Sequence, residues 1–135
     1  MTTQLDTPVA LSEPILFREA KWKDVPAEPG VYVIADRDEI VYVGMAGRNG
    51  KGSIRNRLRD HASGQIVNMF AQYLFLSRVQ FVGADRINHP RDAQVACREY
   101  ISQRCTFRYK TTANAAEARA LERRLKAELR PVLNP

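Results

Sequence analysis

The chain has 135 residues, which suits one domain with a real core and is too short for two independent domains. Its 44% hydrophobic and 27% charged residues are those of an ordinary soluble globular chain. The net charge of +6 favours a polyanionic partner, nucleic acid first, although a generally basic soluble protein explains the charge equally well.

Nothing in the sequence reads as a membrane or secretion signal. The first 14 residues lack a basic and an apolar signal region, and no apolar run approaches the ~20 residues of a membrane span. Cys97 and Cys105 do not form a C-x-x-C pair, and two histidines are too few for a zinc site. We therefore expect a cytoplasmic protein with reduced thiols, and the oligomeric state stays open.

The N-terminal third predicts a leader followed by a β-hairpin. Residues 1–14 are expected to be a flexible leader, and residues 15–135 a single domain. Residues 31–35 and 40–43 are rich in β-branched and aromatic side chains, with a polar turn between them. An odd number of loop residues would place Tyr32 and Tyr42 on one sheet face, where they could lie opposite one another.

A glycine-rich loop over residues 45–52 precedes a predicted helix over residues 53–61, with Ser53 as its N-cap. The loop lies between a strand and a helix, as a nucleotide-binding loop does. However, that motif needs glycine where Met45 stands and serine or threonine where Gly52 stands. A basic loop at a nucleic-acid surface fits better. A twelve-residue window here has no acid and carries five cations: Arg48, Lys51, Arg55, Arg57 and Arg59.

The rest of the chain predicts helices and one further strand. A buried helix is expected over residues 66–76, then a strand over residues 79–82. Pro90 suits the first turn of a helix that runs to about residue 103, and residues 105–110 alternate as a half-buried strand does. A long helix follows, from a capping box at Asn114 to about Arg130. The fold class is therefore α/β (α+β), with a short antiparallel sheet of about three strands flanked by helices.

Glu122 is an acid close to the apolar stripe of this last helix. It lies about 50° from the centre of the stripe on a helical projection. A carboxylate that tends inward must be paired, protonated or bound to a metal. The sequence allows two explanations for Glu122: a buried ion pair with an arginine such as Arg57, or a metal site.

The order of the polar residues resembles the GIY-YIG nuclease family. Its two signatures match Gly30-Val31-Tyr32 and Tyr42-Val43-Gly44. Three later elements match in order: the helix arginine at Arg57, with His61 at a position some members use, the metal-binding glutamate at Glu122 and the terminal asparagine at Asn134. The spacing from Gly44 to Arg57 is longer than in the shortest members, and residues 65–105 match nothing in the family core.

The resemblance implies a small GIY-YIG-like domain that hydrolyses nucleic-acid phosphodiester bonds with one Mg²⁺ or Mn²⁺ ion. Double-stranded DNA is the expected substrate, and RNA stays open. Glu122 would hold the metal, and Arg57 would grip a phosphate oxygen. Tyr32 would orient or deprotonate the attacking water, which requires positive charge nearby to lower its pKa.

The remaining site residues have supporting roles in this expectation. Tyr42 would share the task of Tyr32, His61 is the rival base, and Asn134 would brace the site. Four cations would bind the nucleic acid: Arg48, Lys51, Arg55 and Arg59.

Two other functions are compatible with the same residues. The first is a catalytically silent domain of this fold that binds nucleic acid or a protein. The second is an unrelated basic α/β binding module, in which Glu122 would pair with a structural arginine far from Tyr32.

Overall fold

The computed structural model describes residues 7–47, 52–64 and 90–134, so the predicted helix 66–76 and strand 79–82 lie outside the described residues. In chain order the described elements are β1 (Ile15–Leu16), the 3₁₀ turns η1 (Phe17–Glu19) and η2 (Trp22–Asp24), β2 (Gly30–Asp36), β3 (Glu39–Ala46), α1 (Ile54–Ala62), α3 (Pro90–Arg104), β4 (Cys105–Thr111) and α4 (Ala115–Leu129).

The strands form one antiparallel sheet in the order β1-β4-β2-β3. β2 and β3 are the predicted hairpin, and β4 is the predicted later strand. The two-residue β1 pairs with β4 and adds a fourth strand to the three expected. The predicted fold class is therefore confirmed, and β3 stands at the edge of the sheet.

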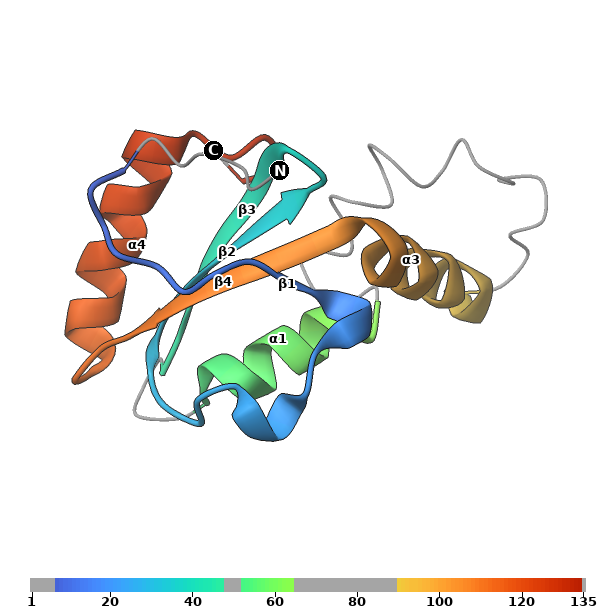
Figure 1. The fold of residues 1–135 in the computed structure, drawn as a ribbon, viewed down its shortest axis with the longest axis horizontal. Helices are drawn as coiled ribbons and strands as arrows, with labels where there is room; N and C mark the ends of the chain where they lie inside the picture. The colour runs from blue at the N-terminus through green and yellow to red at the C-terminus, as the bar shows by residue number, and fades with distance from the viewer. Residues whose placement is uncertain (1–6, 48–51, 65–89, 135) are drawn as a thin grey trace.

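Helices cover both faces of the sheet, with α4 on one side and α1 and α3 on the other (Figure 1). Successive residues of β2 point to alternate faces. Val31 and Val33 therefore pack with Leu125 of α4, while Ile34 packs with Leu58 of α1. The sheet is thus buried on both faces, and a site at its edge can be reached by side chains from either layer.

A β-bulge decides which way Tyr42 points. The hairpin turn contains two residues, since Asp36 pairs with Glu39. An even turn alone would place Tyr32 and Tyr42 on opposite faces of the sheet. However, Ile34 pairs with Tyr42 and Ala35 with Ile40, so one extra residue in β3 shifts the register. The tyrosines therefore share a face, and Tyr32 lies opposite Gly44 rather than opposite Tyr42.

Both predicted helix caps are present. Ser53 Oγ accepts a hydrogen bond from Asn56 N at 3.2 Å, and Asn114 Oδ1 accepts one from Glu117 N at 2.9 Å. α4 ends at Leu129, and its C-cap Arg130 has a left-handed φ of 49°. The predicted loop over residues 45–52 begins later than expected, because β3 continues to Ala46 and its ladder with β2 pairs Gly30 with Ala46.

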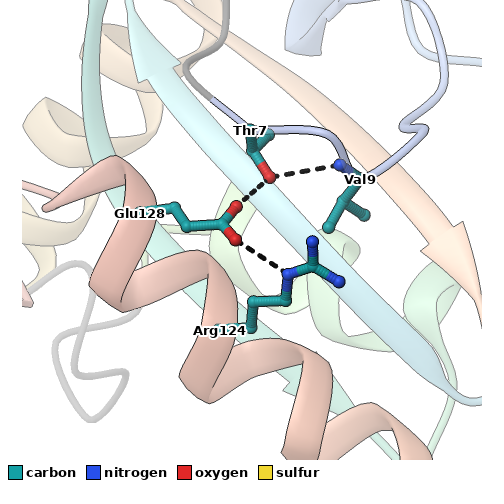
Figure 2. Close-up of polar contacts among 4 residues, drawn as sticks. All are labelled: Thr7, Val9, Arg124 and Glu128. Carbon is teal, nitrogen blue, oxygen red and sulfur yellow. Dashed lines mark hydrogen bonds and ion pairs between the residues drawn. The ribbon is translucent and has the colours of Figure 1, made fainter.

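The end of the predicted leader packs on the domain. Val9 and Leu11 pack against the apolar cluster under α4. Ser12 N donates to Tyr109 O at 2.9 Å. Thr7 Oγ1 donates to Glu128 of α4 (Figure 2). Residues 1–6 lie outside the described part, and the division into a leader and one domain stays a prediction.

Both cysteines are buried, and their expected reduced state stays a prediction. Cys97 lies in α3 and Cys105 begins β4. Burial raises the pKa of the Cys97 thiol to about 11, so this thiol stays protonated at neutral pH. Across the three described ranges, no helix combines the length and apolar character needed to cross a membrane.

Candidate active site

A cleft of about 390 Å³ lies beside the second half of β3, where residues 43–47 form part of its wall. Polar side chains from β2, β3, α1, α4 and the C-terminal segment also line it: Tyr32, Tyr42, Arg57, Glu122, Lys126 and Asn134. The structure thus brings together the predicted phenols, guanidinium, carboxylate and amide in one place.

Gly44 makes room for Tyr32. A Cβ atom at position 44 would lie 2.4 Å from the Tyr32 hydroxyl oxygen, which is far inside contact distance. Gly30 is equally constrained, because a Cβ there would lie 2.2 Å from the Lys110 carbonyl oxygen. At both signature tripeptides, a side chain larger than that of glycine would therefore clash with neighbouring atoms.

His61 lies behind the two tyrosines rather than in the wall of the cleft. Its side chain is buried, and its ring centroid is 5.3 Å from those of both Tyr32 and Tyr42. The Tyr32 hydroxyl and His61 Nε2 are 2.6 Å apart, a short hydrogen bond. His61 can therefore exchange a proton with Tyr32, but the tyrosine ring separates it from the cleft.

The pKa of Tyr32 is raised, whereas the role expected for this residue requires positive charge that lowers it. Burial is the main cause, and the neighbouring Tyr42 raises the pKa further. Arg57 lowers the pKa of Tyr32 but does not compensate for burial. With the protein's own groups alone Tyr32 is therefore a neutral phenol at physiological pH, and its activation then needs a proton acceptor beside it.

Arg57 and Glu122 approach the cleft from opposite layers of the fold, on α1 and α4. Both are half-buried. Within the described residues they form no ion pair with each other. The interpretation of Glu122 as half of a buried pair with Arg57 is therefore wrong, and its carboxylate faces the cleft.

Asn134 is held against the edge strand. Residues 132–134 run along β3, with Leu133 N donating to Val41 O at 2.9 Å. Asn134 Oδ1 then accepts from Val43 N at 3.0 Å, and Asn134 Nδ2 donates to Val43 O at 2.6 Å. The side-chain amide therefore pairs with the backbone as another strand would, and braces β3 where it lines the cleft.

The four cations predicted to bind nucleic acid differ in their exposure and in their contacts. Arg59 is exposed on α1. Arg55 uses its guanidinium inside the fold, because Nε donates to Val25 O at 2.8 Å and one Nη donates to Lys23 O at 3.2 Å. Arg48 and Lys51 lie outside the described residues. Binding by these four residues stays a prediction.

Lys126 is a cleft residue that sequence reasoning missed. It lies one turn after Glu122 on α4, and both side chains line the cleft. The i, i+4 spacing was the available signal, since residues four apart share a helix face.

The donor set of the cleft suits a hard divalent cation with a single protein carboxylate. Glu122 is the carboxylate among the described residues that line the cleft. The described part of the chain contains no cluster of three or more histidine, cysteine, aspartate or glutamate side chains that could hold a metal ion. Mg²⁺ keeps several waters and binds through one or two carboxylates plus substrate phosphates, so one glutamate in an open cleft fits it.

Comparison with known proteins agrees with this geometry. A search of curated proteins gave no match. The family model described as the GIY-YIG catalytic domain matches residues 18–135, which include every polar residue of the cleft. This family consists generally of nucleases. Because the match covers most of the sequence, the chain belongs to the GIY-YIG catalytic domain family.

Proposed function

We propose that this protein is a metal-dependent endonuclease that hydrolyses phosphodiester bonds, with double-stranded DNA as its substrate. The observation that carries the proposal is the single cleft in which Tyr32, Arg57 and Glu122 meet. Phosphodiester hydrolysis needs an activated water, a stabiliser for the added negative charge and help for the leaving oxygen. Each of the three residues meets one of these requirements.

Tyr32 activates the water with His61 behind it. The Tyr32 hydroxyl accepts a proton from the attacking water while it passes its own proton to His61 Nε2, 2.6 Å away. This transfer avoids a free phenolate, whose formation the raised pKa of Tyr32 opposes. It requires His61 to carry its neutral-state proton on Nδ1, so that Nε2 can accept.

Arg57 stabilises the charge that develops on the phosphate. Its guanidinium is always charged and can bind two oxygens in a fork, which lysine cannot reproduce. It enters the cleft from α1, on the side of the sheet that also holds Tyr32. The positive charge of Arg57 therefore lies in the cleft with Tyr32, where the phosphate reacts, and not only along the flanking nucleic acid.

Glu122 would hold the divalent cation, Mg²⁺ or Mn²⁺, on the α4 side of the cleft. Such an ion would supply Lewis-acid polarisation of the phosphate and charge neutralisation for the leaving 3′-oxygen. Asn134 keeps β3 in place through its two bonds to Val43, and Tyr42 contributes a second phenol to the wall.

Plasmid cleavage with Mg²⁺ and with EDTA tests the proposal. The wild-type protein should nick or cut plasmid with Mg²⁺ and not with EDTA. Glu122→Gln should lose ~10²-fold or more of the rate, because it removes a transition-state charge contact. Glu99→Gln, which changes an exposed acid of α3, is the matched control and should cleave normally.

Two results would count against the proposal. Full activity of Glu122→Gln would remove the metal assignment. Wild-type protein that binds DNA but never cleaves it, with either metal, would identify a silent binding domain instead.

A further inference from the structure

A row of three cations runs along the flank of α4 beside Glu122. The row consists of Arg119, Arg123 and Lys126, and we call it the basic row. Spacings of three, four and seven residues place them within about 60° of one another on a helix and over about 10 Å of its length. Arg119 and Arg123 are exposed, whereas Lys126 is half-buried and lines the cleft.

The cations of the basic row form no ion pair within the described ranges. Neither Arg119 nor Arg123 forms an ion pair with a described residue, and Lys126 forms none with Glu122, one turn before it. Like charges at such spacings repel one another and destabilise a helix. A bound polyanion would remove that repulsion.

The opposite flank of the same helix shows the contrast. There Arg124 Nε lies 2.7 Å from Glu128 Oε1, and Glu128 also accepts from Thr7 (Figure 2). The arginine on this flank is therefore neutralised within the fold. Basic residues on α4 are thus not equivalent, and the unneutralised ones lie on the side that leads into the cleft.

We propose that the basic row binds the phosphate backbone of the nucleic acid whose scissile bond lies in the cleft. One strand carries a phosphate charge about every 3.4 Å of its axis, so a row about 10 Å long can contact roughly three successive phosphates. Lys126 is the residue that joins the row to the cleft.

The inference rests on the proposed function and extends its substrate surface. Arg55 and Arg59, the described members of the four cations predicted to bind nucleic acid, lie on α1, which packs on the other face of the sheet. With the basic row, the substrate would be held from both layers, and its backbone would continue along α4.

Equilibrium binding of the full chain to a short fluorescent DNA duplex in EDTA tests the inference. The triple variant Arg119→Ala/Arg123→Ala/Lys126→Ala should bind about tenfold or more weakly at low salt. The slope of log K against log salt should become shallower by about 2 to 3, since each lost phosphate contact removes about 0.9. Arg124→Ala, which removes one arginine from the opposite flank, should keep the wild-type slope. Alanine favours helices, so the triple variant should keep its melting transition, whereas Arg124→Ala should melt slightly lower because it loses the ion pair with Glu128.

The outcomes separate the inference from the proposed function. A triple variant with the affinity and salt slope of Arg124→Ala would overturn the basic row, even if the wild-type protein cleaves plasmid. A triple variant with a reduced slope would support the row, even if the wild-type protein binds without cleaving and the endonuclease proposal fails.

Discussion

Tyr32 combines a fully buried ring with a place in the wall of the cleft. Burial keeps the phenol neutral, so its chemistry depends on the hydrogen bond to His61 rather than on its own ionisation. The two residues should then act as one unit, because neither can move a proton without the other.

Single and double substitutions of this pair test that coupling. His61→Phe keeps an aromatic ring in the buried space but removes the proton acceptor. It should lower the single-turnover cleavage rate by ~10²-fold to 10⁴-fold, the range typical of a general base. Tyr32→Phe should cause a similar loss, and the double variant should be no slower than the slower single variant.

Two measurements decide the interpretation of that cycle. Thermal melts check that the variants still fold, since His61 is buried. A double variant that loses about the product of the two single losses would show that the residues act independently.

Arg57 is the residue whose loss should affect the rate with little effect on folding. It is half-buried on α1 and enters the cleft. Arg57→Ala should reduce turnover by ~10²-fold or more, as the loss of one transition-state donor does elsewhere. Arg57→Lys should recover little, because lysine lacks the planar fork.

The exposed neighbour Asn56 provides the control for that measurement. Asn56→Ala should cleave plasmid at the wild-type rate and melt at the same temperature. Wild-type cleavage by Arg57→Ala would remove this guanidinium from the mechanism.

At the scale of the elements, the β2–β3 hairpin shows how one inserted residue determines a site. Without the bulge between β2 and β3, the two-residue turn would point Tyr42 away from Tyr32. With it, their rings lie 6.4 Å apart at an interplanar angle of 21°, and His61 contacts both.

α4 is attached to the N-terminal segment through Glu128, and that attachment should depend on pH. Hydrogen bonds from Thr7 and then from Arg124 hold the pKa of Glu128 below its ordinary value. A lowered folded-state pKa stabilises the fold above the unfolded value of about 4.3, and this stabilisation is lost as pH falls through the folded value. Glu128→Gln should therefore melt at a slightly lower temperature than wild type at pH 7, and the difference should vanish in strong acid.

Melting curves of wild type and Glu128→Gln at several pH values check this expectation. Glu99→Gln, at an exposed acid of α3, controls for the loss of one negative charge. A difference between Glu128→Gln and wild type that stays constant down to strong acid would show that the charge of Glu128 contributes nothing.

At the scale of the whole molecule, the cleft depends on contacts between distant parts of the chain. Arg57 comes from the layer on one face of the sheet and Glu122 from the layer on the other. The C-terminal segment pairs with the outer edge of β3, which covers otherwise open backbone groups. The edge position of β3 explains why both layers can reach one small site.

Local features of the sequence were sufficient for much of this architecture. Caps at Ser53 and Asn114, alternation in residues 105–110 and the polar turn of the hairpin are short-range signals, and the structure contains the elements that they predict. The order of the polar residues also predicted the family, because Tyr32, Arg57 and Glu122 follow one another in the order of the family's motifs. The match over residues 18–135 confirms this prediction.

Other properties were decided only by tertiary structure, because they depend on which groups become neighbours after folding. The raised pKa of Tyr32 follows from burial by distant parts of the chain, and the position of His61 behind it follows from how α1 packs on the sheet. Lys126 reaches the cleft because α4 crosses the face of β3. The sequence determined which chemical groups are present and in which elements, whereas packing determined their solvation, their partners and the direction in which they point.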